Sequence, residues 1–175
     1  MPRQYLRYTW VSPKLTSGKS KIHGDGVFAT RKITRGEKVM IFGGEFISRE
    51  QAFSGNYRSR SIWPVDLGHY LALPKSDTRE SLDENLNHSC DANTWLIDEV
   101  TIIAKKDIET GEEITLDQGT WNFEDSAYTD NQESCSCGTE SCRYVLTESD
   151  WKLPDVQERY RGHFHPLVQK LIESN

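Results

Sequence analysis

Short hydrophobic runs, separated by Gly, Asn, Asp or Pro, dominate the first two thirds of the chain. Brief runs rich in β-branched and aromatic residues are typical of strands, and the residues between them are typical of turns. The runs cover residues 5–11, 39–42, 45–48, 69–73, 94–98, 101–105 and 113–116. The pattern therefore predicts a mostly β fold with short helices, built from several small sheets.

Helical patterns are confined to residues 48–53 and to the end of the chain. Pro154 and Pro166 stand near the start of two amphipathic segments, 153–160 and 165–173. Proline suits the first turn of a helix because the N–H that it lacks would have no partner there. We expect two short helices whose apolar stripes pack on the sheets, and we assign them no chemistry.

Two segments of the sequence share a turn. The stretches KITRGEKVM at 32–40 and KDIETGEEIT at 106–115 both place Gly-Glu directly before a strand. Glycine is favoured wherever a turn needs an unusual backbone conformation. We interpret the likeness as recurring turn chemistry rather than as an internal duplication.

Length and composition predict one domain with a thin core. The chain has 175 residues, of which 35% are hydrophobic, and its mean hydropathy is −0.69. A chain of this length can close a single core, but its modest apolar content makes a metal site a useful addition to stability.

The charge balance bears on the class of partner. The net charge is −6 and the sequence pI is near 5.4. An acidic chain is poorly suited to holding phosphates, so we expect no direct nucleic-acid partner, whereas a basic, lysine-rich peptide would be attracted. Because the acidic residues are scattered, a merely solvated acidic surface is an equally good explanation.

The sequence indicates neither a membrane span nor export. No apolar run approaches the length that crosses a bilayer, and residues 1–10 lack the apolar centre of a signal peptide. We therefore expect no membrane partner and an intracellular location, cytoplasmic or nuclear and not secreted. In such a reducing compartment, free thiols and zinc are favoured over disulfides.

The cysteines suggest a metal site with one ligand missing. Cys135, Cys137 and Cys142 lie in the stretch SCSCGTESCR, and their C-x-C-x4-C spacing resembles most of a closed tetrahedral zinc site. The one other cysteine in the chain, Cys90, comes 45 residues before Cys135. It would have to cross the fold to complete the site.

Three further motifs are weak when taken singly. Two glycines in Gly24-Asp25-Gly26 would let a ligand approach the backbone, but an ordinary tight turn explains them as well. The stretch Asn87–Cys90 offers a Cys-His pair without an orienting third group, so a nucleophilic role is not favoured. Glu112 and Glu113 are adjacent on a predicted strand and would point to opposite faces, which argues against an acid/base dyad.

Taken together and in order, these motifs resemble those of the SET-domain family of protein-lysine methyltransferases with a post-SET zinc motif. The resemblance covers roughly residues 17–146. The matching positions are Gly24-Asp25-Gly26, Asn87-His88-Ser89-Cys90 with Asn93, Gly111-Glu112-Glu113-Ile114-Thr115 with Asp117, and Cys135, Cys137 and Cys142 with Arg143.

The resemblance implies a fold and a set of boundaries. The fold would be several small β-sheets around a pseudoknot, with a post-SET tail attached through zinc. The chain would divide into an N-terminal strand segment at 1–16, the SET domain at 17–120, the post-SET zinc segment at 121–146 and a C-terminal helical extension at 147–175.

The resemblance also implies ligands. In post-SET members, the cysteine of the N-H-S-C segment completes the zinc site, so Cys90 would join Cys135, Cys137 and Cys142 around a structural Zn²⁺. S-adenosylmethionine would be the cofactor, with the lysine of a protein or peptide as substrate. The implied cofactor-binding residues are His23, Gly24, Asp25, Gly26, Tyr70, Asn87 and His88.

The residues around the reacting amine depart from the family pattern. Members commonly place two tyrosines there; Tyr70 fits the first, although an ordinary buried tyrosine is the alternative, and Gln118 stands at the second. Leu116 replaces the usual Phe or Tyr, and Glu84 replaces an Arg that precedes the Asn-His pair. Glutamine can accept a hydrogen bond from the amine but cannot ionise. We take Tyr70 and Gln118 as the candidate catalytic residues.

Three functions remain open at this point. The first is methyl transfer to a lysine of a histone or of another protein. The second is a catalytically silent module that binds cofactor and a lysine-bearing peptide, motivated by Gln118. The third, a purely structural module, is disfavoured by the intact cofactor motifs. In the enzyme, Trp121, Phe123 or Tyr128 could supply the missing aromatic ring, although core packing is the simpler role for each.

Overall fold

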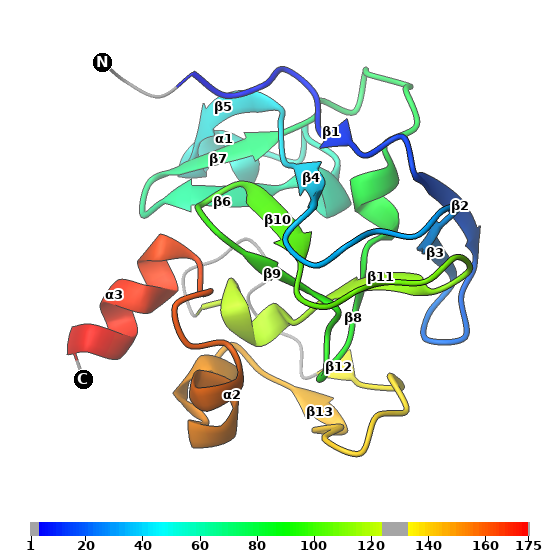
Figure 1. The fold of residues 1–175 in the computed structure, drawn as a ribbon. Helices are drawn as coiled ribbons and strands as arrows, with labels where there is room; N and C mark the ends of the chain where they lie inside the picture. Colours follow the sequence, from blue (N-terminus) through cyan, green and yellow to red (C-terminus); the bar gives the residue numbers. More distant parts are fainter. Residues whose placement is uncertain (1–3, 124–132, 175) are drawn as a thin grey trace.

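Small sheets and short helices build the molecule, as the computed structural model of residues 4–123 and 133–174 shows (Figure 1). The predicted fold class, mostly β with short helices, is confirmed. Three sheets of three or four strands and one two-stranded ribbon account for the strands in the described residues. Most of the polypeptide between them forms turns and short 3₁₀ segments.

The first sheet forms the middle of the main hydrophobic core. All its neighbouring strands are antiparallel. Its strand order is β1 (Trp10–Val11), β4 (Lys38–Ile41), β10 (Thr101–Ala104) and β9 (Thr94–Leu96). The side chains of Met40, Leu96 and Ile102 are fully buried, and each of the four strands overlaps one of the predicted hydrophobic runs.

The second sheet contains the one parallel pair among the described strands. Its order is β2 (Leu15–Lys19), β3 (Asp25–Ala29), β11 (Glu113–Leu116) and β8 (Asn87–His88). Strands β8 and β11 run parallel, with Asn87 opposite Thr115 and His88 opposite Leu116. This pairing brings the Asn-His motif beside the strand that leads to Gln118.

The remaining strands form a three-stranded sheet and a ribbon. The sheet has the order β5 (Glu45–Ser48), β7 (His69–Ala72) and β6 (Trp63–Asp66), and the ribbon pairs β12 (Glu133–Ser134) with β13 (Val145–Leu146). Helix α1 (Arg49–Ala52) follows β5 directly. It begins at a capping box in which Ser48 accepts the backbone N–H of Gln51, whose side chain accepts the N–H of Ser48.

Short 3₁₀ segments and two helices complete the chain. The 3₁₀ segments are η1 (Ser59–Ser61), η2 (Leu82–Asn85), η3 (Gln118–Thr120) and η4 (Asp150–Lys152). Helices α2 (Pro154–Arg159) and α3 (Pro166–Ser174) begin at the two prolines, as predicted. They lie at the opposite end of the molecule from β2 and β3 (Figure 1).

The C-terminal segment is built into the fold by a second core. Helices α2 and α3 bury Val156, Tyr160 and Val168 among aromatic side chains. The Tyr160 hydroxyl also accepts the backbone N–H of Ala92 at 3.1 Å, in the loop before β9. The predicted docking of these helices on the sheets is confirmed in this respect.

The two turns that share Gly-Glu are related by an internal two-fold pattern. Ile33 and Ile108 exchange both backbone N–H···O bonds at 2.9 Å. Three residues later, Gly36 and Gly111 have φ of 83° and 88°, and each donates its N–H to the alanine that ends the opposite strand, β10 or β3. The structural equivalence thus includes the strands next to the two turns as well as the turns themselves.

Six described strands lie outside the hydrophobic runs that we used to predict strands: β2, β3, β6, β8, β12 and β13. Strand β2 reads LTSGK and buries only Leu15 well, so it carries no hydrophobic run. Strand β3 begins inside the glycine-rich stretch that we read as a turn. Conversely, the run at 5–11 forms a strand only at Trp10–Val11.

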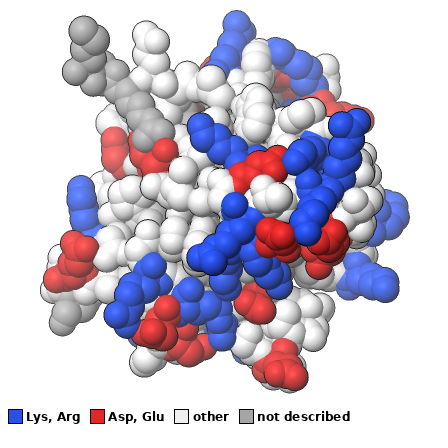
Figure 2. All heavy atoms as spheres, viewed as in Figure 1, with Lys and Arg blue, Asp and Glu red and all other residues white. Residues whose placement is uncertain are grey.

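Surface charges are intermingled. On the face shown in Figure 2, Lys and Arg side chains lie beside Asp and Glu side chains. Ion pairs such as Lys14–Glu37 and Lys105–Asp91 have this character. Among the described helices, none has the length and apolar content that crossing a membrane requires.

Replacing Tyr160 by Phe should test how firmly the C-terminal segment is attached. The substitution leaves the buried N–H of Ala92 without its acceptor, which typically costs about 1 to 3 kcal/mol. We expect Tyr160→Phe to lower the free energy of unfolding by that amount in urea denaturation. Tyr144→Phe, at a tyrosine that is 75% exposed, should leave it unchanged; equal effects would contradict the assigned role.

Candidate active site and zinc centre

A cavity of about 690 Å³ lies where the Asn-His motif, the end of β11 and the cysteine-rich tail meet. Its wall includes three sequence-predicted cofactor residues, His23, Asn87 and His88, and the candidate catalytic residue Gln118. Leu116 also lines it. Segments that are far apart in sequence therefore share one cavity, as the motif order implied.

The glycine turn at 24–26 is fixed by geometry that only glycine allows. Gly24 has φ of 50°, a conformation that strains other residues. A Cβ at Gly26 would lie 2.4 Å from the Glu113 carboxylate. Glycine is thus favoured at Gly24 by the backbone conformation and at Gly26 by the side chain of Glu113 packed against it. The turn follows His23, which lines the cavity.

Asn87 holds this turn in place. Its side-chain amide donates to the backbone carbonyls of His23 at 3.0 Å and Asp25 at 3.1 Å. It also approaches the Glu113 carboxylate at 2.7 Å. All three partners are acceptors, which identifies the nitrogen of the amide unambiguously. Asn87 is therefore the link between the turn and β8.

Glu113 is a structural residue that sequence reasoning missed. Its carboxylate accepts the Ser20 hydroxyl and the Asn87 amide, inside the turn. Glu112 faces away and accepts the backbone N–H of Glu109. The prediction that these two glutamates point to opposite faces is consistent with these partners, and the alternation along β11 was the signal that could have assigned Glu113 to the interior.

His88 is neutral and has a defined tautomer. Its Nδ1 accepts the backbone N–H of Gln118 at 3.0 Å, so the ring proton lies on Nε2, 3.2 Å from the sulfur of Cys90. Burial lowers the pKa of His88 to about 4, although nearby Asp117 opposes that shift. The neutral imidazole thus fixes the backbone at Gln118 and contacts the cysteine cluster.

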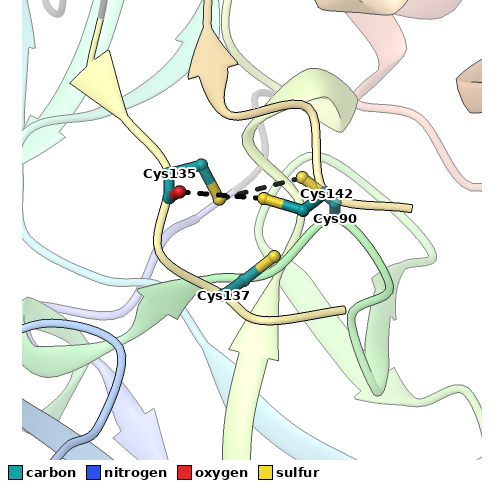
Figure 3. Close-up of side chains that lie close together, drawn as sticks. All are labelled: Cys90, Cys135, Cys137 and Cys142. Atoms are coloured by element: carbon teal, nitrogen blue, oxygen red, sulfur yellow. Dashed lines mark hydrogen bonds between the residues drawn. The ribbon is translucent and has the colours of Figure 1, made fainter. Parts of the chain in front are cut away.

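The four cysteines converge from two distant segments (Figure 3). Their sulfur atoms all lie within 4.8 Å of one another, and none of the four is in a disulfide. A tetrahedral Zn²⁺ with Zn–S bonds of about 2.3 Å would separate its sulfurs by about 3.8 Å, which is the Sγ–Sγ distance between Cys90 and Cys135. The donor set fits zinc, and Cys90 supplies the missing corner.

Metal binding here would displace protons. Burial raises the pKa of the Cys90 thiol to about 11, so without a cation the thiol is protonated at neutral pH. Zn²⁺ binds thiolates, and its affinity for such a site therefore depends on pH. Because all four positions would be filled by sulfur, the site leaves no place for a catalytic water.

Arg143 joins the cysteine tail to the cavity. Its guanidinium donates to both carboxylate oxygens of Asp117, at 2.6 and 2.8 Å, and forms an ion pair with Asp150 at 2.7 Å. Its backbone N–H donates to the sulfur of Cys90. Asp117 is fully buried and accepts the N–H of Gly119, which shapes the turn that contains Gln118.

An aromatic wall lines the cavity, and sequence reasoning missed most of it. Phe42 and Trp63 stack with ring centroids 3.7 Å apart, and Trp121 packs on Trp63 at 4.9 Å. All three line the cavity. Of these, only Trp121 was foreseen as a possible aromatic neighbour of the site. Phe123 belongs instead to the C-terminal core, and Tyr128 lies outside the described residues.

Four predicted site residues are not part of the cavity wall: Gly24, Asp25 and Gly26 of the glycine turn, and Tyr70. Tyr70 lies in a separate cluster. It is 1% exposed and packs with Ile47, Ala52 and Ile62 in a core of its own. Of these residues, Ile62 lines the cavity. The catalytic and cofactor-binding roles of Tyr70 stay predictions, and the alternative of a buried strand tyrosine agrees with its packing.

Charged residues form another part of the wall. Arg60, Asp83 and Glu84 line the cavity. Glu84 pairs through Oε2 with Arg58 at 2.5 Å, while its buried Oε1 has no hydrogen-bond partner among the described residues. Sequence comparison with the family pattern singled out Glu84 as a departure but gave it no role.

Comparisons with known proteins agree with this geometry. Residues 24–119 match the model of the SET domain. Histone-lysine N-methyltransferase TRX1 of Oryza sativa subsp. japonica is 31% identical over 150 residues, covering 77% of this chain and 14% of that protein. Histone H3-lysine(4) N-trimethyltransferase ATX1 of Arabidopsis thaliana is 26% identical over 162 residues, covering 84% and 14%.

A third relative is similar over a smaller share of its length. Histone-lysine N-methyltransferase trithorax of Drosophila virilis is 29% identical over 141 residues, which cover 73% of this chain and 3% of that protein. The chain therefore spans between 3 and 14% of the length of these three relatives.

The purified protein should carry one equivalent of zinc. Cys90→Ser and Cys142→Ser should both lose it, because each removes one of four ligands, and structural zinc contributes on the order of 10 kcal/mol to folding in small modules. Ser141→Ala, beside Cys142 but without a ligand atom in the cluster, is the control. Metal analysis of freshly purified, unchelated protein decides: zinc retained by Cys90→Ser but lost by Cys142→Ser would show that the core cysteine is no ligand.

Proposed function

The chain belongs to the SET-domain family, and on this premise we propose that it transfers a methyl group from S-adenosylmethionine to the ε-amine of a lysine in a protein. The observation that carries the proposal is the single cavity shared by the Asn-His motif, Leu116, Gln118 and the cysteine-rich tail. The Asn-His motif and the cysteine-rich tail are motifs by which the sequence resembles the family, and Leu116 and Gln118 directly follow or lie near a third, Gly111–Thr115.

The residues present fit the cofactor. The turn at 24–26 is held open by Gly24 and Gly26, where a Cβ would be strained or would clash. A buried carboxylate oxygen of Glu84, without a partner among the described residues, can accept a hydrogen bond from a ligand. When bound, S-adenosylmethionine supplies an electrophilic methyl group on a sulfonium.

The chain's own contribution to the reaction is to hold a neutral amine in line. At pH 7, deprotonating a lysine of pKa about 10.4 costs about 4.6 kcal/mol, and an apolar wall lowers that cost because it disfavours the charged form. Phe42, Trp63 and Trp121 provide such a wall. The carboxamide oxygen of Gln118 can then accept an N–H of the amine and orient its lone pair.

Gln118 is also the reason to keep the second function in view. A silent SET-domain module would bind cofactor and a lysine-bearing peptide without turnover, because the phenol common in the family is absent. The packing of Trp121 on Trp63 favours the enzyme, since it places aromatic rings in the wall of the cavity that contains Gln118. We therefore propose the enzyme as the principal function.

The substrate and the setting are part of the proposal. We propose a lysine-bearing, basic protein partner, with histones included because the similar proteins are named for them. An intracellular site of action, nuclear or cytoplasmic, follows from that partner. We retain the proposed divisions 1–16, 17–120, 121–146 and 147–175.

Asn87 offers a test of cofactor binding alone. Asn87→Ala removes the amide that ties the turn to β8, and hydrogen bonds of this buried kind are worth about 1.5 to 3 kcal/mol when charge-assisted. We expect S-adenosylhomocysteine to bind the wild type and to bind Asn87→Ala at least tenfold more weakly in calorimetry. Asn85→Ala, whose amide contacts only exposed Ser17, is the control. Unchanged affinity in Asn87→Ala would remove Asn87 from the site.

Methyl transfer tests the reaction itself. Wild type should label a mixture of lysine-rich proteins and peptides when given methyl-labelled S-adenosylmethionine. Trp63→Ala should lower the rate more than tenfold because it opens the apolar wall, and Gln118→Ala should lower it less, since Gln118 only orients the amine. Tyr70→Phe tests the catalytic role predicted for the Tyr70 hydroxyl: if the hydroxyl has that role, the rate of methyl transfer should fall sharply.

The same assay separates the two functions. Gln118→Tyr restores the family's usual phenol at this position. A wild type that binds S-adenosylhomocysteine but transfers nothing, beside an active Gln118→Tyr, would establish the silent module. Mass spectrometry of the labelled material would identify the substrate and the number of methyl groups added.

A further inference from the structure

We propose that Glu84 and Arg60 bind the amino-acid end of the cofactor, with the Glu84 carboxylate on the α-ammonium and the Arg60 guanidinium on the α-carboxylate. This inference rests on the proposed function. It assigns a role to the position at which the chain departs from the family pattern, where an arginine would be usual and Glu84 stands.

Glu84 is presented to the cavity in a fixed orientation. It lies in η2, three residues before Asn87, so it belongs to the part of the wall that holds the glycine turn. Its Oε2 bonds to Arg58, whose guanidinium also donates to the backbone carbonyls of Asp77 and Arg79. The carboxylate is therefore anchored on one side only.

The other oxygen requires a donor. Oε1 of Glu84 is buried and has no hydrogen-bond partner among the described residues, and a buried, unpaired carboxylate oxygen is costly. The neighbouring acid differs in this respect, because Asp83 receives the hydroxyls of Thr9 and Ser81 on its two oxygens. Of these two acids, Glu84 is the one with a buried carboxylate oxygen that has no partner among the described residues.

Arg60 supplies the opposite charge. It lies in η1, packed against η2, and lines the same cavity. It forms no ion pair with a described residue, whereas Arg58 beside it is committed to Glu84. The cavity wall thus contains a carboxylate oxygen of Glu84 and the guanidinium of Arg60, both without an ionic partner of their own among the described residues. These two groups match the ammonium and the carboxylate of an α-amino acid better than a ligand that carries only one of those charges.

The chemistry of transfer excludes the substrate lysine as the partner of Glu84. A carboxylate next to the ε-amine would stabilise its charged form and raise its pKa, which opposes the neutral state that the reaction needs. The α-ammonium takes no part in the transfer and can stay charged. An anionic residue in this cavity is therefore compatible with catalysis at the amino-acid end and not at the reacting amine.

Three ligands separate the parts of the cofactor. S-adenosylhomocysteine carries both charged groups, its analogue without the α-amino group carries only the carboxylate, and 5′-methylthioadenosine carries neither. Calorimetry on the zinc-loaded chain of 175 residues should give wild-type affinities at least tenfold higher for S-adenosylhomocysteine than for the other two. Equal affinity for S-adenosylhomocysteine and the deaminated analogue would overturn the role of Glu84 without any variant.

The variants then assign each contact. Glu84→Gln keeps an acceptor for Arg58 and should weaken S-adenosylhomocysteine about tenfold or more, while binding of the deaminated analogue and of 5′-methylthioadenosine stays unchanged or tightens. Arg60→Gln should weaken both carboxylate-bearing ligands and leave 5′-methylthioadenosine unchanged. Glu80→Gln, an exposed acid outside the cavity wall, is the control, and thermal unfolding verifies that all variants are folded.

The outcomes distinguish this inference from the proposed function. A wild type that binds none of the three ligands overturns both. If the wild type binds S-adenosylhomocysteine and Glu84→Gln binds all three ligands as tightly, Glu84 has no role in binding and only the inference is overturned. The same holds if Glu84→Gln weakens all three ligands by the same factor, because Glu84 would then have a structural role. Selective loss of S-adenosylhomocysteine alone supports it.

Discussion

The buried carboxylate of Asp117 holds together the parts of the chain on which the site depends. It is fully buried, and a charge in that position is tolerated only when it is paired and hydrogen-bonded. Arg143 meets both of its oxygens, and the same guanidinium reaches Asp150 at the start of the C-terminal segment. The Asp117 carboxylate thereby connects the end of β11, the cysteine-rich tail and the C-terminal segment through Arg143. Asp117 directly precedes Gln118 in the sequence.

A metal ion bound by the four cysteines would support one side of the cavity. Ser134, Cys135, Ser136 and Leu146 line the cavity from the tail side, and the described tail is joined to the core through the cysteine cluster and Arg143. Burial raises the pKa of the Cys90 thiol to about 11, so without a cation this thiol is protonated at neutral pH and makes only weak contacts with the tail cysteines. A structural ion that takes no part in the reaction can therefore determine whether the cysteine-rich tail forms its part of the cavity wall.

The sequence predicted that the four cysteines come together, because the chemistry of a metal site restricts residue type and spacing, and it failed where only packing decides. The resemblance to the SET-domain family led to Cys90 without any knowledge of the path between the segments. Trp63 was missed in favour of Tyr70, although the two lie on adjacent antiparallel strands, β6 and β7. Both strands are buried, so their hydrophobic pattern gives no sign of which one faces the cavity. Strand β2 was missed because it buries almost no apolar surface.

The internal two-fold pattern explains where the cavity forms. Strands β4 and β11 are equivalent, since each follows one of the matched glycine turns. Each pairs on one side with the strand that accepts the N–H of the turn glycine, β10 or β3, and on the other side with a further strand. That further strand is antiparallel β1 for β4 but parallel β8 for β11. Phe42 directly follows β4 and Gln118 follows β11 by two residues, and both line the cavity. The cavity thus lies between the ends of two equivalent strands, β4 and β11. Because the neighbour of β11 is the parallel strand β8, the Asn-His motif, which forms β8, lies beside the end of β11.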